Sequence, residues 1–186
     1  MTITTITPPA SEPVSLAEAK LYLRVDHAHE DTLIATLIGA AREAVEAGIG
    51  RALITRRVRE SLDIWRREAV QGAVLGLGPV TNVVAVRLLT DEGSQSVLNP
   101  ERYRLEGHRD RPRLVFPPGV PATLRSAGGI EIEYDCGFAE DAADLPIALR
   151  LATLQIVASL YELRQGEAPI PEAARALMRP YAPARL

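Results

Sequence analysis

The 186-residue sequence is poor in several features that would point to common functions. Cys136 is its only cysteine, so no intramolecular disulfide can form. The formal charge is −3, whereas nucleic-acid-binding domains usually carry a basic surplus. The most apolar run, 145–163, contains Arg150, Gln155 and Glu162, and the N-terminus lacks signal-peptide character. We therefore expect a globular protein made in the cytoplasm, with no membrane partner.

Recognisable catalytic motifs are also missing. The stretch GAVLGLG at 72–78 matches neither common phosphate-binding loop, and no serine lies in a nucleophile elbow. Cys136 has no neighbouring base to activate it. We therefore predict no enzyme activity and no cofactor. A less favoured alternative is an enzyme site in the central part of the chain that uses Glu131, Glu133 or His108.

Two polar clusters allow a functional and a structural interpretation. His27, His29, Glu30 and Asp31 carry metal-ligating atoms, but acidic residues also favour a helix start, and no second ligand cluster appears. We expect no metal site there. Arg56, Arg57 and Arg59 could contact DNA phosphates, which gives a DNA-binding module as the main alternative function. Nearby acids favour ion pairs between subunits or simple solvation instead.

The first fifty residues have helical periodicity. Ser15 and Glu18 form a capping-box pattern that predicts a helix over 16–23. A second helix is expected from a cap at Asp26 or His29 to about residue 47, ended by Gly48 or Gly50. Because residues 1–13 are rich in threonine and proline, we expect an extended arm there.

From Leu53 the apolar residues alternate, which is typical of strands. The alternating segments and turn residues predict antiparallel strands near 58–64, 74–77, 81–89, 95–98, 103–106, 113–116 and 130–134. Helical periodicity returns at 144–165, where apolar residues cover nearly every face. A helix that is apolar all round must be buried all round, so we expect neighbouring subunits to help cover it.

The pattern as a whole predicts an α+β fold. Its helical core consists of two N-terminal helices and one long C-terminal helix, and an antiparallel β module is inserted between them. The expected segments are a flexible arm at 1–13, a helical part at 14–50, the β module at 51–143, the long helix at 144–166 and a C-terminal tail at 167–186.

Three stretches carry a family pattern in a fixed order. They are PVSLAEAKLYLRVDHAHEDTLIATLIGAAREAVEAGIGRALITRRV at 13–58, LGLGPVTNVVAVRLLTDEGSQSVLNPERYRL at 75–105 and YDCGFAEDAADLPIALRLATLQIVASLYELR at 134–164. Together they resemble the head–tail connector (adaptor) proteins of long-tailed double-stranded DNA phages and phage-like gene-transfer particles. The resemblance spans about residues 13–165. Departures occur at Gly48-Ile49-Gly50, where the family has aromatic-Thr-Gly, and at Gly76 and Gly78.

The resemblance implies a particle-neck protein assembled in the host cytoplasm. Its copies would form a ring, usually of twelve, beneath the portal protein, with a stopper or tail terminator on the far side. Double-stranded DNA would pass through the channel without sequence-specific binding. For portal binding we predict Arg179, Tyr181 and Arg185. The predicted subunit-interface residues are Leu33, Leu37, Arg51, Arg57, Leu149, Ile156 and Leu160.

Overall fold

The computed structural model describes residues 2–63, 73–107, 112–116, 124–125, 127–163 and 169–182. Within it the chain divides into two compact units. The β unit comprises Met1–Pro9 and Thr55–Gly137, and the helical unit comprises Ala10–Ile54 and Phe138–Leu186. The expected insertion of a β module into a helical core is therefore observed, and the described residues contain helices and antiparallel strands, as an α+β fold requires.

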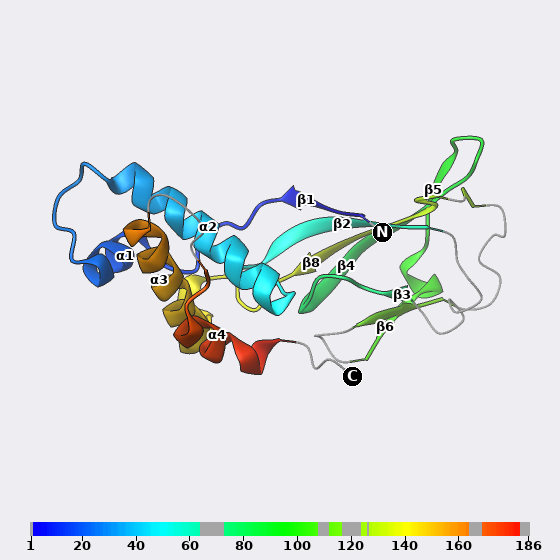
Figure 1. Cartoon of the computed structure of the whole chain (residues 1–186). Coiled ribbons are helices and arrows are strands. Elements are labelled where there is room, and N and C mark those ends of the chain that lie inside the picture. Colours follow the sequence, from blue (N-terminus) through cyan, green and yellow to red (C-terminus); the bar gives the residue numbers. More distant parts are fainter. Residues whose placement is uncertain are drawn as a thin grey trace. The chain divides into compact units, whose positions relative to one another are not determined.

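The helical unit contains α1 (Leu16–Leu23), α2 (Asp31–Ile49), α3 (Ile147–Glu162) and α4 (Glu172–Met178), together with short 3-10 turns at Ala142–Asp144 and Arg179–Tyr181 (Figure 1). The predicted capping box is present, because Ser15 Oγ accepts from the Glu18 amide and Glu18 accepts from the Ser15 amide. Gly50 ends α2 in the left-handed conformation at φ 64°. Local signals thus set these helix ends where the sequence predicts them.

Other helix ends differ from the prediction by a few residues. The second helix is capped at Glu30 rather than at Asp26 or His29, and it continues through Gly48 to Ile49. The last long helix is capped at Pro146 rather than at Asp144. In both cases a turn precedes the helix and takes up the residue that was expected to cap it. The helical core itself is unaffected by these shifts.

The core of the helical unit lies between α2 and α3. Ile34, Ile38 and Val45 of α2 pack in the same buried cluster as Leu149 and Ile156 of α3. Leu53 and Ile54 of the connecting segment belong to this cluster, and both, like the adjacent Ala52, have an exposed fraction of 0%. Glu46 fixes the segment, since its Oε1 accepts from the Leu53 amide at 2.9 Å. The segment is therefore part of the helical core.

The β unit contains two antiparallel sheets. The larger has the order β1-β2-β8-β4-β5 and the smaller the order β3-β7-β6. The strands are β1 (Thr2–Thr7), β2 (Arg56–Leu62), β3 (Ala73–Val74), β4 (Val80–Leu89), β5 (Gln95–Val97), β6 (Arg104–Glu106), β7 (Arg113–Val115) and β8 (Ile130–Cys136), with a 3-10 turn at Pro100–Arg102. Strands β2, β8 and β4 run side by side through the centre of the larger sheet (Figure 1).

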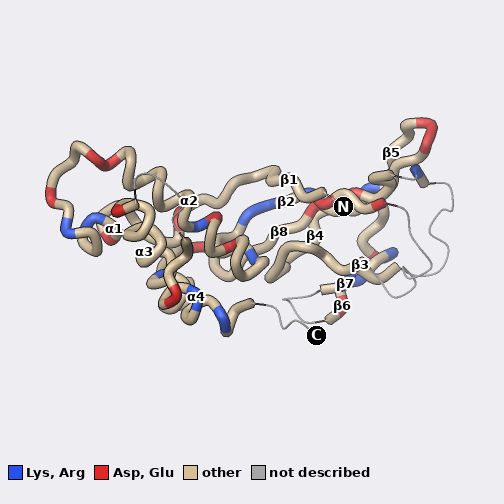
Figure 2. The backbone as a smooth tube through the Cα atoms, viewed as in Figure 1, with Lys and Arg blue, Asp and Glu red and all other residues tan. Residues whose placement is uncertain are grey.

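The two faces of the larger sheet differ in polarity because side chains alternate along each strand. On β8, Ile130, Ile132 and Tyr134 face the buried side and each has an exposed fraction of 0%. Glu131, Glu133 and Asp135 alternate with them and face the other side, beside the basic residues of β2 and β4 (Figure 2). The predicted alternation of β8 is therefore observed, but Glu133 is only 8% exposed, so this acid is buried and not solvated as expected.

Two expected boundaries are corrected by the structure. Residues 2–7 were expected to lie in a flexible arm, but they form β1 and pair antiparallel with β2. An available edge of β2 explains this, since an extended Thr/Ile segment readily completes a ladder. The division into units also falls after Ile54 and after Gly137 rather than at residues 50 and 143, because 51–54 is buried in the helical core.

Candidate functional site

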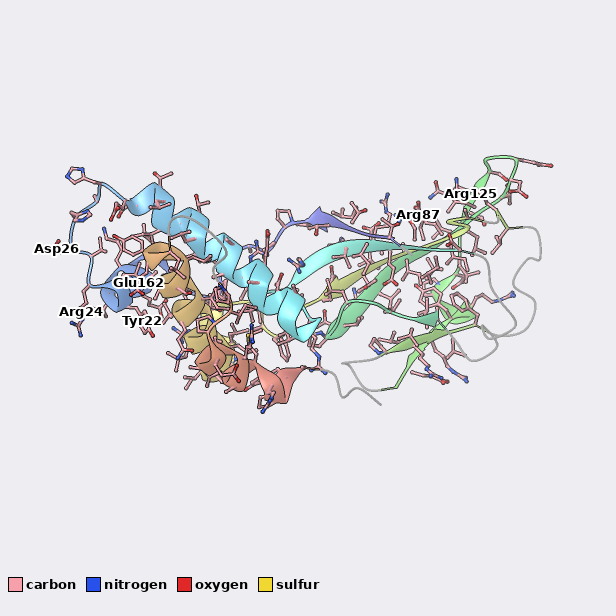
Figure 3. All side chains as sticks on the ribbon, viewed as in Figure 1. Tyr22, Arg24, Asp26, Arg87, Arg125 and Glu162 are labelled. Carbon is pink, nitrogen blue, oxygen red and sulfur yellow. The ribbon has the colours of Figure 1, made fainter. Side chains whose placement is uncertain are left out.

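Exposed apolar side chains lie on two contacting helices of the helical unit. Leu21 and Tyr22 of α1 are 81% and 42% exposed, and Ile147 and Leu151 of α3 are 81% and 37% exposed. Tyr22 projects from the surface of α1 (Figure 3). Arg150 of α3 forms an ion pair with Glu18 of α1, which ties the two helices together. We call these four residues the α1–α3 apolar surface.

The predicted interface residues of α3 do not belong to the α1–α3 apolar surface. Leu149 and Ile156 are 0% and 3% exposed, and they belong to the core that α3 shares with α2. Leu160 is half-buried against the same core. The prediction correctly identified α3 as over-apolar, but it chose the face that the chain covers itself. The residues left uncovered are offset around the helix from those predicted.

The predicted interface residues of α2 are divided. Leu33 is 38% exposed and remains available at the surface. Leu37 is half-buried and packs against the helical core. Both residues lie four positions apart on one side of α2, each next to a buried isoleucine, so the helical period alone does not account for the difference.

Arg51 and the C-terminal segment meet at an aromatic cluster. The Arg51 guanidinium lies 5.9 Å from the centroid of the Phe138 ring, and Arg51 is only 9% exposed. Tyr181 packs edge-on to Phe138 with ring centroids 5.9 Å apart. Arg51 is therefore an internal residue of the helical unit. Of the predicted portal-binding residues, Arg179 is exposed, Tyr181 is partly covered, and Arg185 lies outside the described residues.

Two arginines of β2, Arg57 and Arg59, are paired with acids of the same chain. Arg57 forms two hydrogen bonds to Asp135, at 2.8 and 3.0 Å. Arg59 lies 3.4 Å from Glu133, which also accepts from Arg87 of β4 at 2.7 Å. The hydrogen bond from Arg87 and the pairing with Arg59 lower the pKa of Glu133. Pairing within the sheet reduces the positive potential that a DNA-binding patch requires.

Glu60 is a buried acid on the opposite face of the same sheet. It is 0% exposed, and its Oε2 accepts from Tyr134 Oη at 2.8 Å and from the Gly76 amide at 2.9 Å. Burial raises the pKa of Glu60 and also the pKa of Tyr134. The pair has the composition of an acid–base site, but both side chains are enclosed. Its geometry fits a structural link between β2, β8 and the Gly76 turn.

The residues considered for a metal site or an enzyme site have the following positions in the structure. His27 Nε2 lies 4.0 Å from Glu30, while Asp31 is engaged by Lys20 at 2.6 Å. Within the described part of the chain no three acidic, histidine or cysteine residues gather as a metal site, and no helix has the length and apolar content needed to cross a membrane. Glu131 lies 3.9 Å from Arg59, and His108 falls outside the described residues.

Comparison with known proteins shows what the chain is similar to. Residues 13–75 match the family model described as "Phage gp6-like head-tail connector protein". A chain of the "Virion of native gene transfer agent (GTA) particle" is 28% identical, with a TM-score of 0.83, and the match covers 100% of this chain and 97% of that one. No curated protein matches.

Two further solved structures share these features. Chains from the "Neck of empty GTA particle computed with C6 symmetry" and the "Neck of native GTA particle computed with C12 symmetry" are each 27% identical, with a TM-score of 0.80. Both matches cover 100% of this chain and 97% of the other. Fold and comparisons together make the chain similar to proteins of gene-transfer-particle necks. The resemblance to the head–tail connector family is confirmed.

Proposed function

We propose that this chain is a non-enzymatic head–tail connector that forms a ring, of twelve copies, beneath a portal protein. The ring would link the capsid to the tail side and form part of the DNA channel. A stopper or tail terminator would bind its far side. The chain would assemble in the host cytoplasm and remain in the neck of a phage or gene-transfer particle.

One observation carries the proposal. The whole chain, including both units, matches a chain of a particle neck that was computed with C12 symmetry. A cyclic ring needs an interface on each subunit that the subunit itself does not cover. The α1–α3 apolar surface is our candidate for this interface, because exposed apolar side chains on two contacting helices are typical of protein–protein interaction sites.

The charged face of the larger sheet supports a channel role over DNA binding. Its arginines are matched by acids on β8, as the Arg57–Asp135 and Arg87–Glu133 pairs show. A balanced surface holds the duplex weakly, and weak contact is what a conduit for DNA requires. The DNA-binding module considered from sequence is therefore the less favoured function.

The assembly state tests the proposal directly. Mass photometry and negative-stain imaging of the purified chain, alone and mixed with portal rings, should show a closed ring of about twelve copies. A chain that stays monomeric at all concentrations and never binds the portal would contradict the proposal. Salt-dependent binding to duplex DNA that Arg57→Ala weakens would favour the DNA-binding alternative.

Portal binding by the C-terminal segment needs a test that spares the fold. Deleting 171–186 would remove Ala174 and Met178, which are buried in the helical core. Arg179→Ala and Arg185→Ala are better variants, and Arg175→Ala is the matched control because its side chain is 56% exposed on neighbouring α4. We expect weaker portal binding only in the first two. Equal binding by all three variants would contradict the assignment of portal binding to Arg179 and Arg185.

A further inference from the structure

Strand β1 is an unprotected edge of the larger sheet. Its sequence TITTIT contains no charge, proline or glycine, and among the residues that the structure describes it pairs only with β2. All six of its residues are exposed. Natural sheet edges are usually protected by lysine, proline, bulges or a covering element, because a free edge accepts further strands. The register shift in β1 lies at Thr5–Thr7, so Thr2–Thr5 remains a regular edge.

The side chains of β1 are also incompletely covered. Ile3 lies opposite Glu60 and Thr5 lies opposite Val58, both of which are buried. Ile3 is therefore on the apolar side of the sheet, yet it is 38% exposed, and Ile6 is 42% exposed. One more strand beyond β1 would extend the apolar side and cover Ile3.

The opposite edge of the same sheet has matching properties. Within the described part of the chain, strand β5 pairs only with β4; it carries no charge and is exposed at all three residues, with Val97 at 67%. Every neighbouring pair from β1 to β5 is antiparallel, so β1 and β5 run in the same direction. Rotation about an axis roughly along the strands preserves this direction, so β5 of one copy can meet β1 of the next as a parallel pair.

We propose that the larger sheet continues from copy to copy, with β5 of one subunit pairing along β1 of its neighbour. The inference rests on the ring proposed above and assigns a second contact within it. Closed rings require two different, complementary surfaces on each subunit, and a sheet with two unlike free edges has them. Backbone hydrogen bonds would provide the affinity, and the Thr/Ile and Val side chains would set the register.

Paired cysteines test the contact between the two edges. Thr4 and Val97 lie opposite Arg59 and Arg87, which both pair with Glu133, so both positions belong to the same face of the sheet. We expect the Thr4→Cys, Val97→Cys double variant, treated with a short bismaleimide, to give a ladder of covalent oligomers. Each single variant should give no ladder. The native Cys136 is buried and should not react.

A charged residue at the edge gives an independent test. Val97→Glu places an acid opposite Arg87, which the isolated chain tolerates, but it puts a charge where the next subunit would pair. Val74→Glu is the matched control, because Val74 is 46% exposed and lies opposite Arg113 in the smaller sheet. We expect Val97→Glu to shift the mass distribution from rings to monomers and Val74→Glu to leave the rings intact.

The outcomes separate this inference from the proposed function. Wild-type rings without a covalent ladder, or rings that persist in Val97→Glu, would overturn the strand pairing and leave the connector role standing. Covalent dimers from Thr4→Cys alone would indicate pairing between two β1 strands, which also overturns it. An unmodified chain that never forms rings, with or without portal, would overturn both.

Discussion

Glu60 is a single residue whose environment predicts a pH effect on stability. Burial raises its pKa, so the folded state holds this proton more tightly than the unfolded state. The free energy of unfolding should therefore fall as pH rises from the ordinary carboxyl pKa through the raised value. Glu60→Gln cannot titrate but keeps an oxygen for Tyr134 and Gly76. We expect this variant to match the wild type in acid and to exceed it at neutral pH in urea unfolding.

Glu133 serves as a control of opposite sign. The hydrogen bond from Arg87 is the main cause of its lowered pKa, so its contribution to stability is present above the ordinary carboxyl pKa. That contribution is lost as pH falls through the lowered value. Glu133→Gln should therefore be less stable than the wild type at neutral pH and equal to it in strong acid. The same trend with pH in both variants would contradict the assigned environments.

At the scale of elements, the packing of α4 on α2 depends on Gly48. A Cβ at this position would lie 2.3 Å from Met178 Cε, so Met178, 4% exposed, would have to move. Met178 Cε is the far end of a flexible side chain and can shift, so we expect its displacement to offset the gain in helix propensity and Gly48→Ala to change the free energy of unfolding by less than about 1 kcal/mol. Urea denaturation monitored by circular dichroism measures the change.

Gly39 provides the matched control within the same helix. A Cβ there would meet only Glu12 Oε1, at 3.9 Å, which is an ordinary contact. Gly39→Ala should therefore stabilise the chain, by up to about 1 kcal/mol. Equal effects from both substitutions would show that α4 does not pack on α2 at Gly48.

Elements governed by local chemistry could be predicted from the sequence. The capping box at Ser15, the left-handed Gly50 and the alternation of Ile130–Tyr134 each depend on neighbours a few residues away, and all three are confirmed. The pairing of β1 with β2 joins residues fifty or more positions apart, and the Thr/Ile sequence of β1 does not specify its partner. The arm was therefore misjudged although its extended conformation was expected.

At the scale of the whole molecule, the sequence likewise does not specify which side of an element remains exposed. Periodicity identified α3 as apolar on all sides, but the choice between Leu149 and Ile147 depends on where α2 packs. Likewise, the charges of Arg57 and Arg59 are visible in sequence, whereas their acids on β8 lie more than seventy residues away. Which side of an element remains free is a tertiary property, and it decides where a partner can bind.

Assembly can therefore be separated from folding by two substitutions on α3. Ile147 is 81% exposed, so Ile147→Ser should change the free energy of unfolding by about 0.5 kcal/mol or less. Leu149 is 0% exposed in the helical core, so Leu149→Ala should cost about 2–5 kcal/mol. Urea unfolding measures both values, and the two residues differ by only two positions in the same helix.

Ring formation should be sensitive to substitution of Ile147 and insensitive to substitution of Leu149, the reverse of the effects on unfolding. If the α1–α3 apolar surface is a subunit contact, Ile147→Ser combined with Leu21→Ser removes the two most exposed aliphatic side chains from it while the chain stays folded. Mass photometry should then show folded monomers, because the interface has lost its apolar centre. Leu149→Ala should still form rings under conditions where it remains folded. Intact rings from the double variant would assign the subunit contact to another surface of the chain.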